Sequence, residues 1–169
     1  MMRTSLLATL LLLLAGCGFH LRGAVELPEA MARTQIVAPA SSALRYEIES
    51  LLLAADGEVV EEAGVASAIL TVQRDQVRSR ILSVDPQGRA REYALSLSVQ
   101  YRLQDAEGKE LVAQQSSRVE RSLRVDPDNV LAQASEREMV EQEMRATAAR
   151  IIVRRLRSLL QGVEAIPAQ

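Results

Sequence analysis

The sequence contains a single cysteine, Cys17, a single histidine, His20, and no tryptophan. One cysteine cannot form a disulfide within the chain, so the fold must be stabilised by its hydrophobic core. His20 has no second histidine with which to bind zinc, and it lies only three residues from Cys17. A Ser-His triad, thiol catalysis and ordinary zinc sites are therefore excluded. Glycine-rich phosphate loops are also absent, and the sequence predicts no catalytic residue, no metal ligand and no enzyme.

Long apolar runs are also scarce, and the main one lies at the N-terminus. Residues 6–14 are almost entirely leucine, but nine residues are too few to span a bilayer. The run is typical of a secretory signal, and the following Leu14-Ala15-Gly16-Cys17 resembles the lipobox of bacterial lipoproteins. We expect cleavage after Gly16 and lipid on Cys17, with no other cofactor. The alternative is an ordinary signal with a cysteine near the cut by chance.

The charges are nearly balanced, with a formal net charge of −2, and nothing indicates a nucleic-acid partner. Lys109 is the only lysine, and every other basic side chain is arginine. The planar guanidinium suits phosphate and carboxylate groups, although a GC-rich genome would also favour arginine codons.

Hydrophobic periodicity predicts six elements after a tether. An apolar strand at 34–38 is followed by a helix from Leu44 to Ala55, capped by Ser41 or Ser42 and stopped by Gly57. Three strands should follow, joined by turns at 85–88 and 105–108: residues 66–84 with a bulge near 74–77, residues 93–103 and residues 111–125. Asp126-Pro127 should begin a last helix that Gly162 ends, and its first turns should bend or pack separately.

The order β-α-β-β-β-α predicts an α+β fold, a two-layer sandwich. Two helices would cover one face of a four-stranded, mostly antiparallel sheet. The other sheet face would be polar and must meet water or a polar partner. We divide the chain into a cleaved signal (1–16), a lipidated tether (17–33), the α+β domain (34–161) and a tail (162–169).

Arginines form the remaining candidate site. If the turn at 85–88 pairs Val84 with Arg89, alternation places four arginines on one side of the sheet at one end. They are Arg78, Arg80, Arg89 and Arg91. Like charges repel there unless an anion binds, so these residues could hold a phosphorylated lipid or sugar. Alternatively, they form a solubilising hairpin tip neutralised by Asp85 and Glu92.

The sequence resembles the family of LPS-assembly lipoproteins called LptE. The resemblance rests on Cys17-Gly18-Phe19-His20-Leu21-Arg22-Gly23, with weaker similarity at 88–93, 121–122 and 126–156. It implies the fold above, an outer-membrane location with which Gly18 agrees, and a position as a plug inside the β-barrel LptD. It also implies help in assembling that barrel, and in delivering lipopolysaccharide to the cell surface. Family binding positions near the middle hairpin and the last helix fall on Pro86 and Gln133 here, so Arg89 and Arg91 would substitute for them by neighbourhood.

Two hypotheses follow. In the first, the protein is a non-catalytic subunit of the outer-membrane lipopolysaccharide translocon, lipid-anchored on the periplasmic side, within the barrel lumen. In the second, it is a free periplasm-facing lipoprotein that binds small lipids or supports another envelope transporter. Co-purification of a large barrel separates the two.

Overall fold

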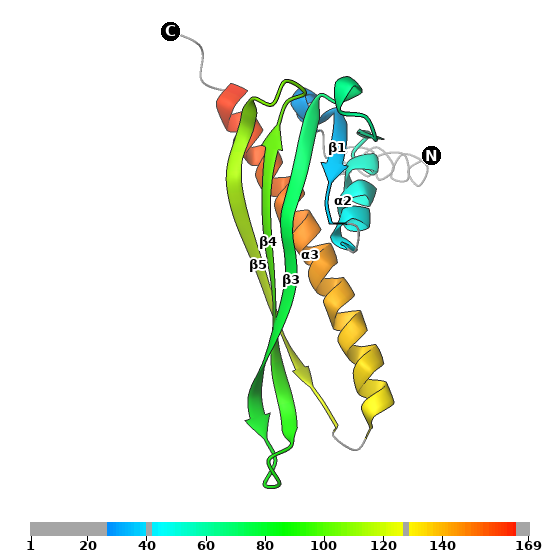
Figure 1. Ribbon diagram of the computed structural model, residues 1–169, viewed down its shortest axis with the longest axis vertical. Coiled ribbons are helices and arrows are strands. Elements are labelled where there is room, and N and C mark those ends of the chain that lie inside the picture. Colours follow the sequence, from blue (N-terminus) through cyan, green and yellow to red (C-terminus); the bar gives the residue numbers. More distant parts are fainter. Residues whose placement is uncertain (1–26, 40–41, 127–128, 165–169) are drawn as a thin grey trace, which may run out of the picture.

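The computed structural model describes residues 27–39, 42–126 and 129–164, and Figure 1 shows their arrangement. Two short 3-10 helices, Glu29–Met31 and Ala63–Val65, lie among the regular elements. These elements are β1 (Arg33–Val37), α2 (Leu44–Leu53), β2 (Glu58–Val60), β3 (Ala68–Val84), β4 (Ala90–Gln104), β5 (Glu110–Arg124) and α3 (Val130–Glu164).

The strands form one mixed sheet in the order β2-β1-β3-β4-β5. β1 is parallel to both β2 and β3, whereas β3, β4 and β5 form two long antiparallel hairpins. β1 pairs only with the Ala68–Thr71 segment of β3. The sheet therefore narrows to three strands toward the β3–β4 turn, and Figure 1 shows this ribbon extending away from β1 and α2.

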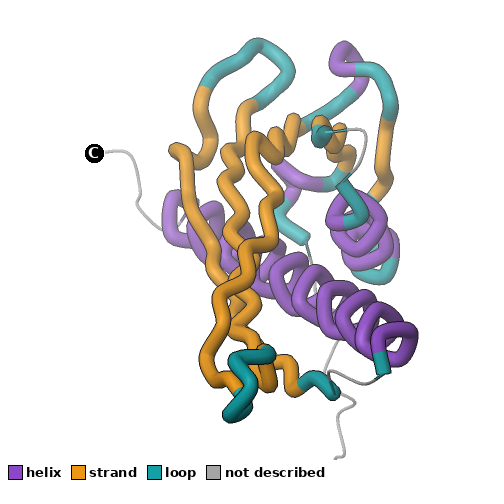
Figure 2. Tube along the Cα trace, turned by 60° about the horizontal axis from the view of Figure 1, so that its bottom comes forward, coloured by secondary structure: helices purple, strands orange, loops and turns teal. Residues whose placement is uncertain are grey.

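Both α-helices cover the same face of the sheet, as Figures 1 and 2 show. The alternation predicted for β4 is confirmed, because its odd-numbered positions from Leu95 to Leu103 are buried and the even ones are not. The buried odd-numbered side chains of β4 pack against Leu44, Ile48 and Leu52 of α2 and against the buried stripe of α3. That stripe consists of Met144, Ala148, Ala149, Ile152, Val153, Leu156 and Leu160. The two-layer α+β prediction is thus correct in its layers.

The number of strands was predicted wrongly, because β2 adds a fifth strand. It is only three residues long and follows Gly57, which reads as the end of a helix rather than the start of a strand. The domain also begins earlier than residue 34. Met31 is fully buried, its carbonyl accepts a hydrogen bond from the Thr34 hydroxyl, and Leu27 packs on the core. The last residues assigned to the tether therefore belong to the folded domain.

The ends of α2 differ from the prediction. Ser42 does not cap the helix through its side chain, because its hydroxyl donates to the Asp75 carboxylate on β3, 2.8 Å away. Ser41 lies outside the described residues. At the other end, Asp56 and not Gly57 takes the left-handed conformation, with φ 59°. Gly57 is required by space instead, since a Cβ there would lie 3.0 Å from the Leu52 carbonyl oxygen.

The last helix, α3, is continuous over 35 residues, about 52 Å at 1.5 Å per residue. It begins at Val130, and Asn129 caps it, because the Asn129 side-chain oxygen accepts a hydrogen bond from the Ala132 amide. Pro127, the predicted first residue, lies outside the described residues. The helix also continues through Gly162 to Glu164, which corrects the predicted end. Its side chains from 132 to 143 are exposed or half-buried, so the first turns remain outside the core although the helix is unbroken.

Candidate functional site

The sheet face opposite the helices is open and polar. Residues paired across the three long strands share a face, and the register defines rows across it. Three neighbouring rows, each written from β3 through β4 to β5, are Arg74–Gln100–Ser116, Gln76–Ser98–Arg118 and Arg78–Ser96–Glu120. In the second and third rows long side chains stand on the outer strands, while β4 contributes Ser98 and Ser96 at the centre. This difference in side-chain length hollows the face along β4.

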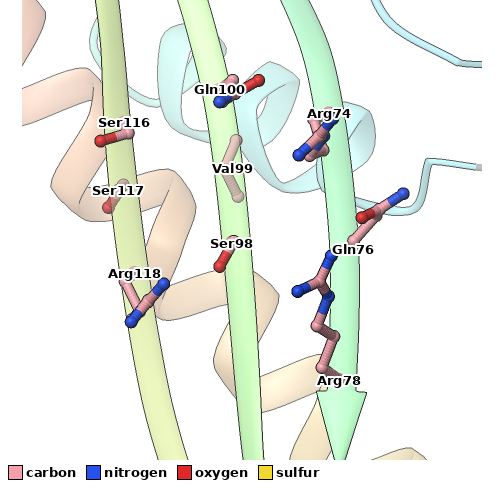
Figure 3. A pocket seen from close by; sticks show the side chains of 9 residues that line it. All are labelled: Arg74, Gln76, Arg78, Ser98, Val99, Gln100, Ser116, Ser117 and Arg118. Atoms are coloured by element: carbon pink, nitrogen blue, oxygen red, sulfur yellow. The ribbon is translucent and has the colours of Figure 1, made fainter.

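Two adjoining hollows, of about 320 and 340 Å³, lie along this face. They share Arg78, Ser98 and Arg118. Figure 3 shows the first hollow, with Arg74 and Arg78 reaching from β3, and Arg118 reaching from β5, toward the centre. The second continues toward the β3–β4 turn and adds Arg80 and Glu120. We call this serine-floored depression, walled by Arg74, Arg78, Arg80 and Arg118, the arginine trough.

The arginine trough carries an excess of positive charge. Its four arginines are exposed, and within the described part of the chain none of them has an ion-pair or hydrogen-bond partner. Glu120 contributes the one carboxylate among the residues that line the two hollows. Guanidinium groups and hydroxyl groups that line the same hollow can donate hydrogen bonds to the oxygens of a phosphate group. The trough is therefore built to attract anions.

The turn between β3 and β4 holds the other predicted arginines in a different environment. Asp85 Oδ1 accepts hydrogen bonds from the amides of Gln87 and Arg89, while its Oδ2 pairs with two guanidinium groups. Arg89 Nε lies 2.8 Å from that oxygen and Arg91 Nε lies 3.7 Å from it. The Asp85 side chain is only 4% exposed. Both arginines are thus held at the tip of the hairpin.

The Asp85 carboxylate is stabilised in its charged form. Burial alone would raise its pKa, but hydrogen bonds from the Arg89 amide and guanidinium, the charge of Arg89 and the Gln87 amide outweigh burial. The pKa therefore lies below its ordinary value of 3.8. The charged Asp85 carboxylate stabilises the folded hairpin tip. This stabilisation is fully present above the pKa that Asp85 has in the unfolded chain, and it is lost as the pH falls through the lower pKa that Asp85 has in the folded chain.

We expect Asp85→Asn to loosen the hairpin tip at neutral pH. Asparagine keeps an oxygen that can accept the two amide hydrogen bonds, but it lacks the charge that holds Arg89 and Arg91. Amide hydrogen exchange followed by NMR should show several-fold lower protection at Arg89. In the wild type the same loss of protection should occur only at a pH below the ordinary carboxylate pKa of 3.8, because the pKa of Asp85 in the folded tip is lower than that.

The second hairpin turn supplies a matched control. Asp105 Oδ1 accepts a hydrogen bond from the Lys109 amide, in the same arrangement as Asp85 with the Arg89 amide. Gly88 and Gly108 take similar positive φ angles in the two turns, 79° and 83°. Asp105 forms no ion pair with any of the described residues, so Asp105→Asn should lower amide protection at its own turn less than Asp85→Asn does at the first turn. Equal effects of the two substitutions would contradict a role for the arginine pairs.

The structure separates the four arginines that the sequence grouped together. Arg78 and Arg80 lie on the polar face as predicted, opposite Ser96 and Ala94, whereas Arg89 and Arg91 pair with Asp85 at the tip. The predicted register was wrong at that end.

Val84 pairs with Ala90 rather than with Arg89. Counting back from a Val84–Arg89 pair would place Arg80 opposite Tyr93 and Leu82 opposite Arg91. Instead Arg80 pairs with Ala94, Ile81 pairs with Tyr93, Ser83 pairs with Glu92, and Leu82 is skipped in the register. Two register shifts, between Ile81 and Ser83 and between Ser83 and Val84, account for these differences. For Arg89 and Arg91, the structure therefore agrees with a hairpin tip neutralised by Asp85 rather than with a shared anion-binding cluster.

Arg74 and Arg118 were missed in the sequence. The alternation along β3 slips between Val72 and Arg74, and this bulge turns Arg74 onto the polar face. A bulge was predicted near this place, and following the pattern backward from Arg78 would have found Arg74. Arg118 joins the trough through its pairing with Ser98, which the sequence did not reveal.

Cys17, the predicted lipidation site, lies outside the described residues. Within the described residues no group of three or more His, Cys, Asp or Glu side chains could hold a metal ion. The same part of the chain contains no helix with the length and apolarity needed to cross a bilayer.

One sheet face buried under helices and one open face lined by arginines define a small two-layer α+β domain. The sequence model of the LptE family, described as lipopolysaccharide-assembly, matches residues 25–156, and the chain belongs to this family. The resemblance found in the sequence is thereby confirmed. The family is named for assembly of lipopolysaccharide rather than for a reaction.

Two relatives carry the name LPS-assembly lipoprotein LptE. The protein of Photorhabdus laumondii is 32% identical over 154 residues, which cover 90% of this chain and 84% of the relative. The protein of Pectobacterium atrosepticum is 30% identical over 159 residues, which cover 90% of this chain and 83% of the relative. The chain is accordingly a lipoprotein of lipopolysaccharide assembly.

Solved structures of bacterial lipoproteins share the fold. The solution structure of lipoprotein B from Nitrosomonas europaea is 35% identical, with a TM-score of 0.71 over 87% of this chain and 96% of that chain. The crystal structure of rare lipoprotein B from Shewanella oneidensis superimposes with a TM-score of 0.68 over 78% of this chain and 98% of that one. Its 24% identity supports the fold alone.

Proposed function

We propose that the protein is a non-catalytic subunit of the outer-membrane lipopolysaccharide translocon, anchored by lipid on Cys17. In this proposal it plugs an LptD-type β-barrel, assists the assembly of that barrel and helps to deliver lipopolysaccharide to the cell surface. Membership of the LptE family supports the proposal. The elongated shape in Figure 1 supports it as well, because a long, narrow domain with a polar face suits a water-filled lumen. A lumen of sufficient width requires more than about 20 strands.

The arginine trough is the surface that we assign to lipopolysaccharide within this function. Lipopolysaccharide carries phosphate groups on its sugars, and charge-assisted hydrogen bonds from guanidinium groups are the strongest contacts available to them. The observation that favours this surface over the hairpin tip is that the side chains of Arg78 and Arg118, which line the same hollow with Ser98, have no partner among the described residues. At the tip, Arg89 and Arg91 already have a carboxylate partner in Asp85.

Co-purification tests the barrel partner. Tagged protein expressed at native level should bring down a large heat-modifiable β-barrel from detergent-solubilised membranes. The polar sheet face should also resist proteases in intact membranes. If the protein purifies alone and remains protease-sensitive, it is the free periplasm-facing lipoprotein of the second hypothesis, and the plug proposal is wrong.

Replacing Arg78 and Arg118 together by glutamine should weaken lipopolysaccharide binding about tenfold, which corresponds to about 1.4 kcal/mol. The substitution removes two guanidinium groups that face the same hollow but leaves the buried core unchanged. The measurement is a titration of the mature chain, carrying Cys17→Ser, with fluorescent lipopolysaccharide at 150 mM salt.

The double substitution of Arg89 and Arg91 by glutamine is the matched control. It removes the same charge from the hairpin tip, where both guanidinium groups are engaged by Asp85. We expect less than a twofold change in affinity. A larger loss from the tip pair than from the trough pair would move the binding site to the hairpin tip and contradict the assignment.

A further inference from the structure

A second hollow, on the opposite side of the molecule from the arginine trough, lies between the two helices. It has a volume of about 380 Å³, with a floor that includes Leu51, Ala55 and Val153. Ala55 and Val153 are buried, and Leu51 is half-buried. Three arginines of α3, spaced four and three residues apart, also line it: Arg150, Arg154 and Arg157. An apolar floor with a cationic rim suits an amphiphile that carries a negative charge. We call this site the helix groove.

The position of the helix groove relates it to the membrane anchor. The described chain begins at Leu27, whose side chain lies against Gly57 and the C-terminal end of α2. The groove is formed at that same end of α2, by Leu51 and its neighbours. Leu27 is ten residues after Cys17, and ten residues span at most about 35 Å even when fully extended. The end of the domain that carries the groove must therefore stay near the anchored lipid.

The first part of α3 is acidic, and the part that lines the helix groove is basic. Residues 130–143 contain four acidic side chains and one basic, whereas residues 144–164 contain five arginines and a single acid, Glu164. The helix dipole favours cations only within the last turn. Arg150 and Arg154 lie ten or more residues before the end of the helix, so the dipole does not account for them. Arg154 is exposed and has no ion-pair or hydrogen-bond partner among the described residues, and Arg150 donates only to Thr147 of its own helix.

We propose that the helix groove is a contact site for the anionic phospholipid headgroups of the membrane that holds the anchor. The arginines would meet the phosphates, and the apolar floor would receive the adjoining glycerol and first methylenes. This contact places the C-terminal half of α3 at the headgroup surface beside the anchor, and the β3–β4 hairpin tip lies at the opposite end of the domain (Figure 1). The proposal rests on lipid at Cys17, but it does not depend on the arginine trough or its ligand.

Vesicle flotation tests this proposal. The mature chain carrying Cys17→Ser should bind vesicles of phosphatidylethanolamine and phosphatidylglycerol (7:3) in preference to vesicles of phosphatidylcholine alone. Replacing Arg150, Arg154 and Arg157 by glutamine should lower the partition coefficient at least tenfold, since each arginine at an anionic surface contributes roughly fivefold. Circular dichroism melting should show that this variant folds. The double variant Arg150→Gln and Arg154→Gln repeats the test with exposed positions only.

The matched control removes three arginines from the other face of the sheet: Arg78, Arg80 and Arg118, each replaced by glutamine. This variant has the same net charge, and it should keep vesicle binding within twofold of the wild type. Conversely, the groove variant should keep wild-type affinity for lipopolysaccharide, which separates failure of this proposal from failure of the trough. Equal losses from both triple variants, equal binding to neutral vesicles, or unchanged binding of the groove variant would overturn the proposal.

Discussion

Replacing Leu97 by alanine should lower the free energy of unfolding by about 3 kcal/mol, within the range measured for buried leucines. Leu97 is fully buried at the middle of β4, and its neighbours across the sheet on the same face are Val77 and Val119. Truncation there removes apolar contacts and leaves a cavity that two β-strand backbones cannot collapse to fill. Because domains of this size are stable by only about 5–15 kcal/mol, the loss is a large share of the total. Urea unfolding followed by circular dichroism measures it.

Ser98→Ala, at the next position on the same strand, is the control. Ser98 faces the arginine trough rather than the core, and surface substitutions of this kind change stability by less than about 0.5 kcal/mol. A pair of adjacent residues with such different effects tests the assignment of the two sheet faces directly. Similar losses from both substitutions would mean that β4 is not buried on one face only.

The sequence predicted the two faces of β4 correctly because burial on one side imposes strict alternation over many residues. The helix α2 was predicted for a similar reason, since Leu44, Ile48 and Leu52 repeat along a single stripe. The ends of α2 were not predicted, because the Ser42 hydroxyl donates a hydrogen bond to Asp75 on a distant strand instead of capping the first turn of its own helix. The strand β2 escaped prediction because three residues are too short to show any period.

The candidate site was predicted only in part, and the reason is register. A bulge shifts every residue beyond it to the opposite face, so one shift changes which arginines share a surface. Arg78 and Arg80 lie between the bulges of β3, and they were placed on the correct face. Arg91 lies beside the register shift at Ser83 and Val84, so its direction depends on where that shift falls relative to Asp85. Local sequence does not determine that choice.

Cys17→Ser should move the protein from the membrane fraction to the soluble fraction. The family relatives are named lipoproteins, and Cys17 is the only thiol that could carry the lipid. Two or more acyl chains are enough for stable anchoring, whereas none leaves only surface contacts. Fractionation of cells expressing each form measures the shift.

Mass spectrometry of the purified wild type distinguishes lipidation from other causes of that shift. The mature chain should begin at Cys17 and carry a thioether-linked diacylglycerol and an acylated amine, whereas an unmodified sulfur or a retained leader would contradict the anchor. The helix groove predicts a further difference between the two forms. Cys17→Ser protein should retain weak membrane binding that 0.5 M salt abolishes, because exposed charges are screened within a few ångströms at that ionic strength. The lipidated form should resist the same salt, since its attachment is hydrophobic.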